Sequence, residues 1–313
     1  MNEPLMPPQP QTAPKTPKLW ESVGLVLLQM LTLLVLLLVL GALNALLQWG
    51  QAGLIYFSFF GEILLLIPLL GWMLLRGLSW RETFAIRPAS GKMLLLAVAL
   101  GVLVWFPANA AALPFEWWLS KIGSAPELPT PQNAGQALIL GITVIVAAPI
   151  VEEPMFRGFV LRGWLPVGSG AAVLVSGVLF GMLHGQLAQL VALIIVGVLL
   201  GVVALRSGSI FPPMVLHATF NAISFFALMN QDKLAWLSDA DVLKIGAVVL
   251  PLFVWMVFLL LRSSPKPAAP GKPPSDADWV LAAVGGVLVM GLFGLFAVLD
   301  ILSRLLPPTL TGL

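Results

Sequence analysis

Residues 22–48 have the sequence SVGLVLLQMLTLLVLLLVLGALNALLQ, which contains no charged side chain. A membrane-spanning helix needs about 20 predominantly apolar residues, so this stretch is long enough to cross a bilayer. Further apolar stretches follow it at residues 53–75, 92–113, 136–164, 169–186, 188–206, 210–229, 241–261 and 279–305. The sequence therefore predicts an all-α, polytopic membrane protein.

The composition of the whole chain supports this class of protein. Of its 313 residues, 59% are hydrophobic and only 10% are charged, and the mean hydropathy is +1.00. Soluble domains carry about 25% charged residues, so the deficit excludes a cytosolic enzyme, a nucleic-acid-binding protein and a disordered scaffold. Cysteine is absent, which excludes disulfides, thiolate metal sites and a cysteine nucleophile. The expected partner is the lipid bilayer and not a nucleic acid.

Four segments divide the chain. Residues 1–20 are rich in proline and polar side chains and predict a disordered cytoplasmic tail, with no pattern of a cleavable signal peptide. Residues 21–262 contain the first eight apolar stretches and predict a transmembrane core. Residues 263–278 are rich in proline and predict a stiff linker. Residues 279–313 then form an additional transmembrane helix.

The fourth apolar stretch carries two adjacent acids and an arginine, Glu152, Glu153 and Arg157. Glu153 and Arg157 are four residues apart, so they can pair on one face of a helix. Glu152 points about 100 degrees away, which leaves it as the freer carboxylate and a candidate general base. Pro149 and Pro154 flank the two acids and predict a break in the helix. Irregular backbone at membrane depth is typical of a protein-enclosed cavity.

The chain has only two histidines, and both lie in apolar stretches. His184 follows Phe180 by four residues, so the two side chains share a helix face. His217 and Asn221 have the same spacing, on another stretch. Ionisable side chains inside a membrane are functional candidates by default. A ridge of small residues beside His184 predicts the close approach of another helix; it consists of Gly177, Gly181 and Gly185.

A carboxylate and two imidazoles in a buried cavity suit hydrolysis of a peptide bond by either of two routes. In the first, Glu152, His184 and His217 are possible ligands of Zn²⁺, which activates a water. In the second, no metal is required: Glu152 and His184 position and deprotonate the water, and His217 and Asn221 stabilise the oxyanion. The residues alone leave both routes open.

Two other classes of protein also fit a polar cluster within the membrane. A proton-coupled transporter would use Glu62, Glu152 and the histidines as a relay. A catalytically silent immunity or chaperone protein would bind a peptide in the cavity without cutting it.

Three short motifs give the chain a resemblance to a known family. They are Glu152-Glu153-Pro154-Met155-Phe156-Arg157, Phe180 to His184, and His217-Ala218-Thr219-Phe220-Asn221. In this order, each on its own span, they resemble the E-E-x-x-x-R, F-x-x-x-H and H-x-x-x-N/D motifs of the CAAX protease and bacteriocin-processing family, also called the abortive-infection family. That family includes the type II CAAX prenyl endopeptidases, and the similarity covers about residues 138–230.

The resemblance implies an eight-helix intramembrane protease core, with a conical cavity open to the cytosol and to lipid. The ninth transmembrane helix, expected from the last apolar stretch, lies beyond the resemblance. It implies Glu152 as the water-activating base, His184 as its partner, and His217 with Asn221 as the oxyanion site. Glu153 and Arg157 would orient the first motif, and Phe180 would pack beside the site. The implied substrate is a peptide or a prenylated protein. We favour the mechanism without a metal.

The basic residues predict the orientation of the chain. Cytoplasmic loops are enriched in lysine and arginine. If the amino terminus is cytoplasmic, the nine stretches place most of the sixteen basic residues on that side: Lys15, Lys18, Arg76, Arg81, Arg87, Lys92, Arg157, Arg162, Arg206, Arg262, Lys266 and Lys272. The other side receives Lys121, Lys233, Lys244 and Arg304. In a plasma (inner) membrane, the sequence thus predicts a cytoplasmic amino terminus and an outside carboxyl terminus.

This orientation is testable with fused reporters. A phosphatase that folds only outside the cytoplasm should be active when it is fused after Leu313 and inactive when it is fused before the first span. A cytoplasmic signal from the fusion after Leu313 would contradict the prediction.

Overall fold

A computed structural model describes residues 15–123, 129–263 and 272–305 of the chain. Most of the predicted proline-rich tail, at residues 1–14, and most of the predicted linker, at residues 264–271, lie outside the described residues. So do residues 306–313 at the end of the chain.

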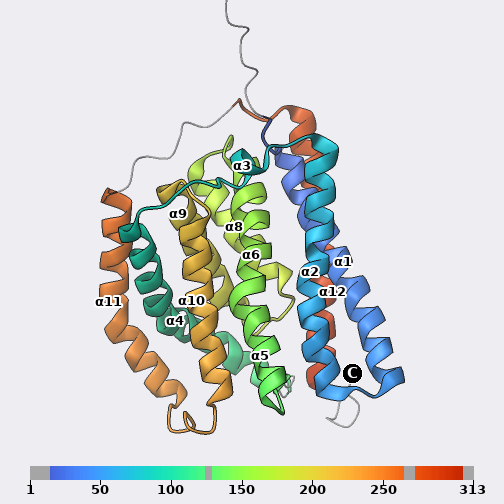
Figure 1. Ribbon diagram of the computed structural model, residues 1–313, viewed down its shortest axis with the longest axis vertical. Coiled ribbons are helices and arrows are strands. Elements are labelled where there is room, and N and C mark those ends of the chain that lie inside the picture. The colour runs from blue at the N-terminus through green and yellow to red at the C-terminus, as the bar shows by residue number, and fades with distance from the viewer. Residues whose placement is uncertain (1–14, 124–128, 264–271, 306–313) are drawn as a thin grey trace, which may run out of the picture.

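The secondary structure of the described residues is entirely helical (Figure 1). The helices are α1 Leu19–Leu47, α2 Gly50–Arg76, α3 Trp80–Thr83, α4 Gly91–Ser120, α5 Ala134–Ile142, α6 Ala148–Glu153, α7 Leu161–Trp164, α8 Ser169–Leu183, α9 Leu190–Ser207, α10 Phe211–Met229, α11 Asp239–Ser263 and α12 Asp276–Leu305. Two π-helical segments, η1 Thr143–Ala147 and η2 Pro154–Val160, join α5, α6 and α7 into one continuous span. The protein is therefore an all-α, multi-pass integral membrane protein, as predicted.

Eight helical segments of the described chain are long and apolar enough to cross a membrane. The stretch predicted at residues 169–186 forms the shorter helix α8, which has 15 residues. At 1.5 Å per residue, α8 is about 22 Å long, less than the roughly 30 Å of hydrocarbon in a bilayer. The chain turns back after it at Gly185, whose φ of +66° is easily adopted only by glycine. Helix α8 is therefore too short to cross the hydrocarbon region of a bilayer by itself.

Helices α8 and α9 approach each other until their backbones touch. A Cβ atom built on Gly197 of α9 would lie 2.8 Å from the carbonyl oxygen of Gly177 and 2.9 Å from its Cα. The small-residue ridge predicted on α8 is thus a helix-packing surface, and its partner lies within the same chain. Around this contact the largest fully buried side chains include Met155, Phe156, Phe159, Phe180 and Leu200.

The terminal helices α1 and α12 are packed along each other, next to α2 (Figure 1). Lys18, before α1, lies 3.8 Å from Asp278 at the start of α12. Glu21 of α1 forms an ion pair with Arg76 at the end of α2. These contacts gather the start of α1, the end of α2 and the start of α12 at one end of the bundle.

Basic residues that the sequence assigns to one membrane side do lie together in the structure. Arg87, Arg157, Arg162 and Arg206 line a common cavity of about 320 Å³. Arg206 also donates a hydrogen bond of 2.8 Å to the carbonyl oxygen of Leu261, near the end of α11. The bundle therefore has a cation-rich end. Which membrane face this end occupies stays a prediction.

The α8–α9 contact predicts a sharp difference between two glycines of α9. Gly197→Ala should lower the free energy of unfolding by about 1–3 kcal/mol, because its new methyl group meets backbone atoms that cannot move aside. Gly201→Ala is the matched control, since its Cβ would lie 3.4 Å from its nearest neighbours, an ordinary contact. Thermal unfolding of both variants in detergent checks the prediction, and equal melting temperatures would contradict it.

Candidate active site

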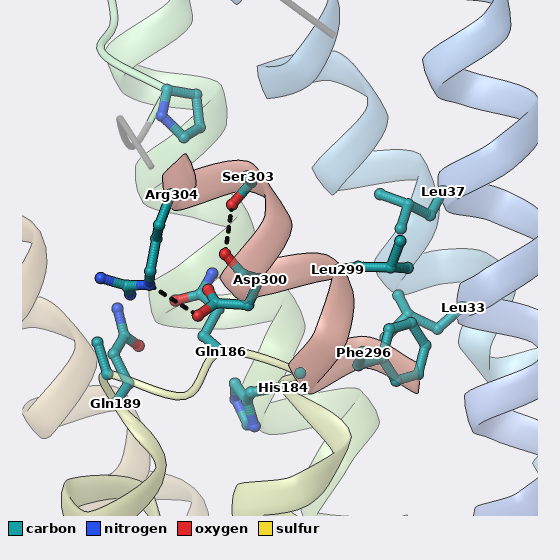
Figure 2. Close-up of a pocket in the computed structure, with 13 residues that line it drawn as sticks. Leu33, Leu37, His184, Gln186, Gln189, Phe296, Leu299, Asp300, Ser303 and Arg304 are labelled. Carbon is teal, nitrogen blue, oxygen red and sulfur yellow. Dashed lines mark hydrogen bonds and ion pairs between the residues drawn. The ribbon is translucent and has the colours of Figure 1, made fainter. Parts of the chain in front are cut away.

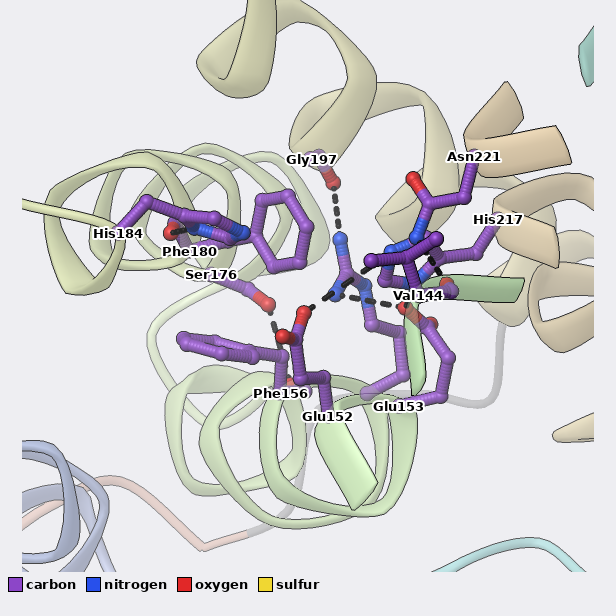
Figure 3. A network of polar contacts seen from close by, with 11 residues as sticks. Val144, Glu152, Glu153, Phe156, Ser176, Phe180, His184, Gly197, His217 and Asn221 are labelled. Carbon is purple, nitrogen blue, oxygen red and sulfur yellow. Dashed lines mark hydrogen bonds and ion pairs between the residues drawn. The ribbon is translucent and has the colours of Figure 1, made fainter. Parts of the chain in front are cut away.

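One carboxylate oxygen joins the first motif to the third (Figure 3). Glu153 Oε1 accepts a hydrogen bond of 3.1 Å from Arg157 Nη1 and another of 2.9 Å from His217 Nδ1. Arg157 Nη2 donates to the carbonyl oxygen of Gly197 at 2.9 Å. All three side chains are buried. The predicted pairing of Glu153 with Arg157 is confirmed, and it also ties the fourth span to α9 and α10.

Glu152 lies beside this network but is not a part of it. Its Oε2 is 3.9 Å from His217 Nε2, beyond the distance of a direct hydrogen bond. The side chain is buried, and Oε2 has no hydrogen-bond partner among the described residues. The two adjacent glutamates thus differ in one respect: Glu153 is held by two donors at Oε1, although its Oε2 has no partner among the described residues, whereas no hydrogen bond within the described ranges holds Glu152.

The two histidines are held in the same tautomer by different acceptors. His184 Nδ1 lies 2.8 Å from the carbonyl oxygen of Phe180. A carbonyl oxygen only accepts hydrogen bonds, so Nδ1 carries the hydrogen. The carboxylate of Glu153 fixes His217 Nδ1–H in the same way. In both neutral rings Nε2 is then the nitrogen with a lone pair, available to another group.

The ring of Phe180 lies between the two imidazoles. Its centroid is 4.9 Å from that of His184 and 5.5 Å from that of His217. The guanidinium carbon of Arg157 lies 4.7 Å from the same ring, and the Phe156 ring packs against it edge-on at 5.2 Å. Phe180 therefore packs within the site, as the resemblance implies, and it separates His184 from the Glu153 network.

The structure brings Glu152 and His217 close together but leaves His184 apart from both. Among the described residues, His184 forms no hydrogen bond or ion pair with Glu152. The direct Glu152–His184 partnership that the sequence suggests is therefore not present as a contact. In Figure 3, His184 lies across the Phe180 ring from His217, at the end of α8.

Asn221 has a structural partner that the sequence analysis missed. Its Nδ2 donates a hydrogen bond of 2.7 Å to the carbonyl oxygen of Val144 in η1. In η1 the N–H of Ala148 bonds to the carbonyl of Thr143, five residues earlier. In that register Pro149 would be the donor to Val144, but proline has no N–H. Asn221 supplies the missing donor and still has one further amide hydrogen.

A second side chain bonds to the irregular backbone on the other side of the glutamates, at the carbonyl of Phe156, which also accepts a hydrogen bond from the N–H of Leu161. Ser176 Oγ of α8 donates a hydrogen bond of 3.0 Å to the carbonyl oxygen of Phe156 in η2. Ser176 is fully buried. The sequence motifs do not predict roles for Ser176, Val144 or Gly197, because each forms its hydrogen bond with a residue that is distant in the sequence.

The possible zinc site is not supported by the arrangement of the predicted ligands. Zinc ligands bind at about 2.0–2.2 Å and therefore converge on a single point. No group of three or more histidine, aspartate or glutamate side chains within the described ranges could hold a metal ion. The Phe180 ring between His184 and His217 is the physical reason. Glu152, His184 and His217 thus do not fit zinc as they are placed.

Two cavities reach the residues of the motifs. The cation-rich cavity described above is lined in part by Arg157. A larger one, of about 520 Å³, is lined by His184 and by residues of α1 and α12. Glu152 lines neither of these two cavities.

Comparison with known proteins identifies the region that contains this site. Residues 134–223 match the family described as type II CAAX prenyl endopeptidase Rce1-like. The predicted resemblance to the CAAX protease family is confirmed. The matched range includes every predicted site residue, from Glu152 to Asn221. Helices α1, α2, α4, α11 and α12 lie outside it.

A curated relative carries no functional description. It is an "uncharacterized 24.3 kDa protein" of Escherichia coli, 30% identical over 122 residues, which cover 36% of this chain and 52% of the relative. The chain thus spans about half the length of that relative. No solved structure matches the chain.

The Glu153 network predicts that Arg157 is needed for stability. Arg157→Gln should lower the free energy of unfolding by about 3–5 kcal/mol, because it removes one partner of a buried ion pair. Arg162→Gln is the matched control, since Arg162 is a half-buried arginine five residues further along the same span. The free energy of unfolding of both variants is measured in detergent. A similar decrease in the two variants would contradict the stabilising role of the Glu153 network.

Proposed function

We propose that this protein is an intramembrane endopeptidase of the CAAX protease type. The observation that carries the proposal is the carboxylate of Glu152, which is buried, keeps one oxygen without a partner, and lies 3.9 Å from His217 Nε2. The match of residues 134–223 to the endopeptidase family supports the same chemistry. The substrate class is a peptide or a protein, prenylated or not, that reaches the site within the membrane.

In the proposed reaction Glu152 is the general base. It takes a proton from a water whose oxygen bonds to the carbonyl carbon of the scissile peptide. His184 Nε2, the ring nitrogen that its Phe180 hydrogen bond leaves with a lone pair, accepts a hydrogen bond from the O–H that the water retains. The tetrahedral intermediate then collapses, the C–N bond breaks, and the proton held by Glu152 passes to the leaving amine.

His217 and Asn221 would stabilise the oxyanion of that intermediate. His217 would donate from Nε2 when that nitrogen carries a proton, with its Nδ1–H held on Glu153. Asn221 donates the amide hydrogen that is not bonded to Val144. Glu153 and Arg157 act as positioning residues. No step in this scheme requires a metal, and the protein would act in the plasma (inner) membrane.

The central test replaces the base. Glu152→Gln should lower the rate of cleavage of a quenched-fluorescent peptide library by about 10²- to 10⁴-fold, the usual contribution of general acid–base catalysis. Glu82→Gln is the control, since Glu82 is a half-buried residue paired with Arg87 outside the apolar spans. Purified wild type that cleaves no peptide, or a Glu152→Gln variant as fast as wild type, would overturn the proposal.

The metal question has its own measurement. Cleavage by the wild type should be unchanged by a zinc chelator, and elemental analysis should find no stoichiometric zinc. Loss of cleavage on chelation, with recovery on addition of zinc, would contradict the metal-free scheme and leave the endopeptidase proposal intact.

A proton-coupled transporter is the second candidate, because Glu62 of α2 is close enough to Glu152 for their charges to interact. Glu62 Oε2 is buried and has no hydrogen-bond partner among the described residues. Two neighbouring acids on different helices are what a proton relay requires. A proton flux in proteoliposomes that is lost in Glu62→Gln, together with absence of cleavage, would favour the transporter.

A further inference from the structure

The larger cavity described above is lined by His184 and lies at the α8–α9 turn, next to α1 and α12 (Figure 2). One wall is apolar and comes from α1 and α12, with Leu33, Leu37, Phe296 and Leu299. The volume of about 520 Å³ falls within the range of about 300–1,000 Å³ that is usual for ligand sites.

The opposite wall is polar and rich in hydrogen-bond donors. It includes Gln186 and Gln189 of the α8–α9 turn and Arg304 of α12. Arg304 is only 7% exposed, and its Nε donates to Asp300 Oδ2 at 2.9 Å. Nε makes the hydrogen bond found for this side chain within the described ranges, and Figure 2 shows the guanidinium beside Gln189, which also lines the cavity.

The position of α12 links this cavity to the proposed catalytic centre. Phe296 lies close to the turn after His184, since a Cβ atom on Gly185 would be 3.5 Å from its ring. At the end of α12, the carbonyl of Arg304 is packed against Gly123, after α4. Phe296 thus places α12 in contact with the α8–α9 turn, although the helix lies outside the region that matches the family.

We propose that this cavity is a substrate subsite, in which α12 binds the peptide segment on one side of the scissile bond. Apolar side chains of that segment would lie against Phe296 and Leu299, and its carbonyl or terminal carboxylate oxygens would accept hydrogen bonds from Arg304. The proposal rests on the proposed endopeptidase function, because His184 connects the subsite to the reacting atoms. It makes α12 a determinant of specificity.

The polar wall favours a peptide over a lipid chain as the occupant. An acyl chain has no acceptors for Arg304, Gln186 and Gln189, and covering these donors without partners would cost free energy. A peptide presents apolar side chains and regularly spaced carbonyl oxygens, so it satisfies both walls. The pairing with Asp300 leaves the cavity without a large net charge from α12.

Steady-state kinetics of two peptides tests the subsite. The first carries leucines on both sides of the bond that the wild type cleaves, and the second is truncated on the side that enters the cavity. Phe296→Ala should raise KM for the first peptide about tenfold, equivalent to about 1.4 kcal/mol, with kcat changed less than twofold and no effect on the second. Arg304→Gln should act in the same direction. Val287→Ala, on the exposed face of α12, should change nothing.

Unchanged KM for the first peptide in both Phe296→Ala and Arg304→Gln would overturn the proposal. So would a fall in kcat alone, because that result assigns α12 a structural role. The melting temperature of each variant in detergent identifies a variant that has lost its fold, and Phe296→Ala leaves the Asp300–Arg304 pair in place.

A labelling experiment separates this proposal from the proposed activity. The chain has no cysteine, so Leu299→Cys in the Glu152→Gln background places a single thiol in the cavity, and Val287→Cys places one outside it. The first peptide, which carries leucines on both sides of the cleaved bond, should slow maleimide labelling of the cysteine at position 299 but not of the cysteine at position 287. If the peptide protects position 299 from labelling but the wild type cleaves no peptide, the proposed endopeptidase function is wrong and the proposed peptide-binding site is retained. Protection by a lysophospholipid instead of the peptide, or no protection, would overturn the subsite.

Discussion

The Oε1 atom of Glu153 is the point on which the arrangement of the site depends, because it accepts hydrogen bonds from both Arg157 and His217. Through Arg157 it is also connected to the carbonyl of Gly197. A buried ion pair is weak evidence for stability, since desolvation of the charges offsets their attraction. Its effect here is positional: it fixes the fourth span, α9 and α10 relative to one another and selects one tautomer of His217. Glu152, the preceding residue, therefore lies beside His217 and takes no part in the network of hydrogen bonds.

This arrangement requires an irregular backbone around the two glutamates. Pro149 and Pro154 remove donors from the fourth span, and π-helical turns form on both sides of α6. In a bilayer every carbonyl without a partner is costly, so irregular turns persist only where protein groups satisfy them. Asn221 of α10 does so for the carbonyl of Val144, and Ser176 of α8 adds a second hydrogen bond to the carbonyl of Phe156. Asn221 consequently combines a structural bond to Val144 with its proposed part in the chemistry, and its substitution would disturb both.

The features that follow from local spacing could be predicted from the sequence. Apolar stretches of sufficient length predicted the spans, the four-residue spacing predicted the Glu153–Arg157 pair, and the glycines of α8 predicted a close helix contact. What could not be predicted depends on contacts between distant segments. Phe180 lies between the two histidines because α8 is packed against the fourth span and faces α10, and no motif spacing encodes that placement. The convergence of Glu152, His184 and His217 on a metal was an open possibility in the sequence for this reason.

The two histidines are oriented by different hydrogen-bond acceptors. Of the two, His184 is the one that lies next to a turn in contact with α12. His217 is oriented by Glu153, and hence by the whole buried network. His184 is oriented by the carbonyl of Phe180, within its own helix, and lies where α8 ends and the chain turns. Its position relative to Glu152 therefore depends on the α8–α9 turn, which Phe296 contacts at Gly185. A helix beyond the family's matched region is thus in contact with the turn next to His184, a residue that the Glu153 network does not hold.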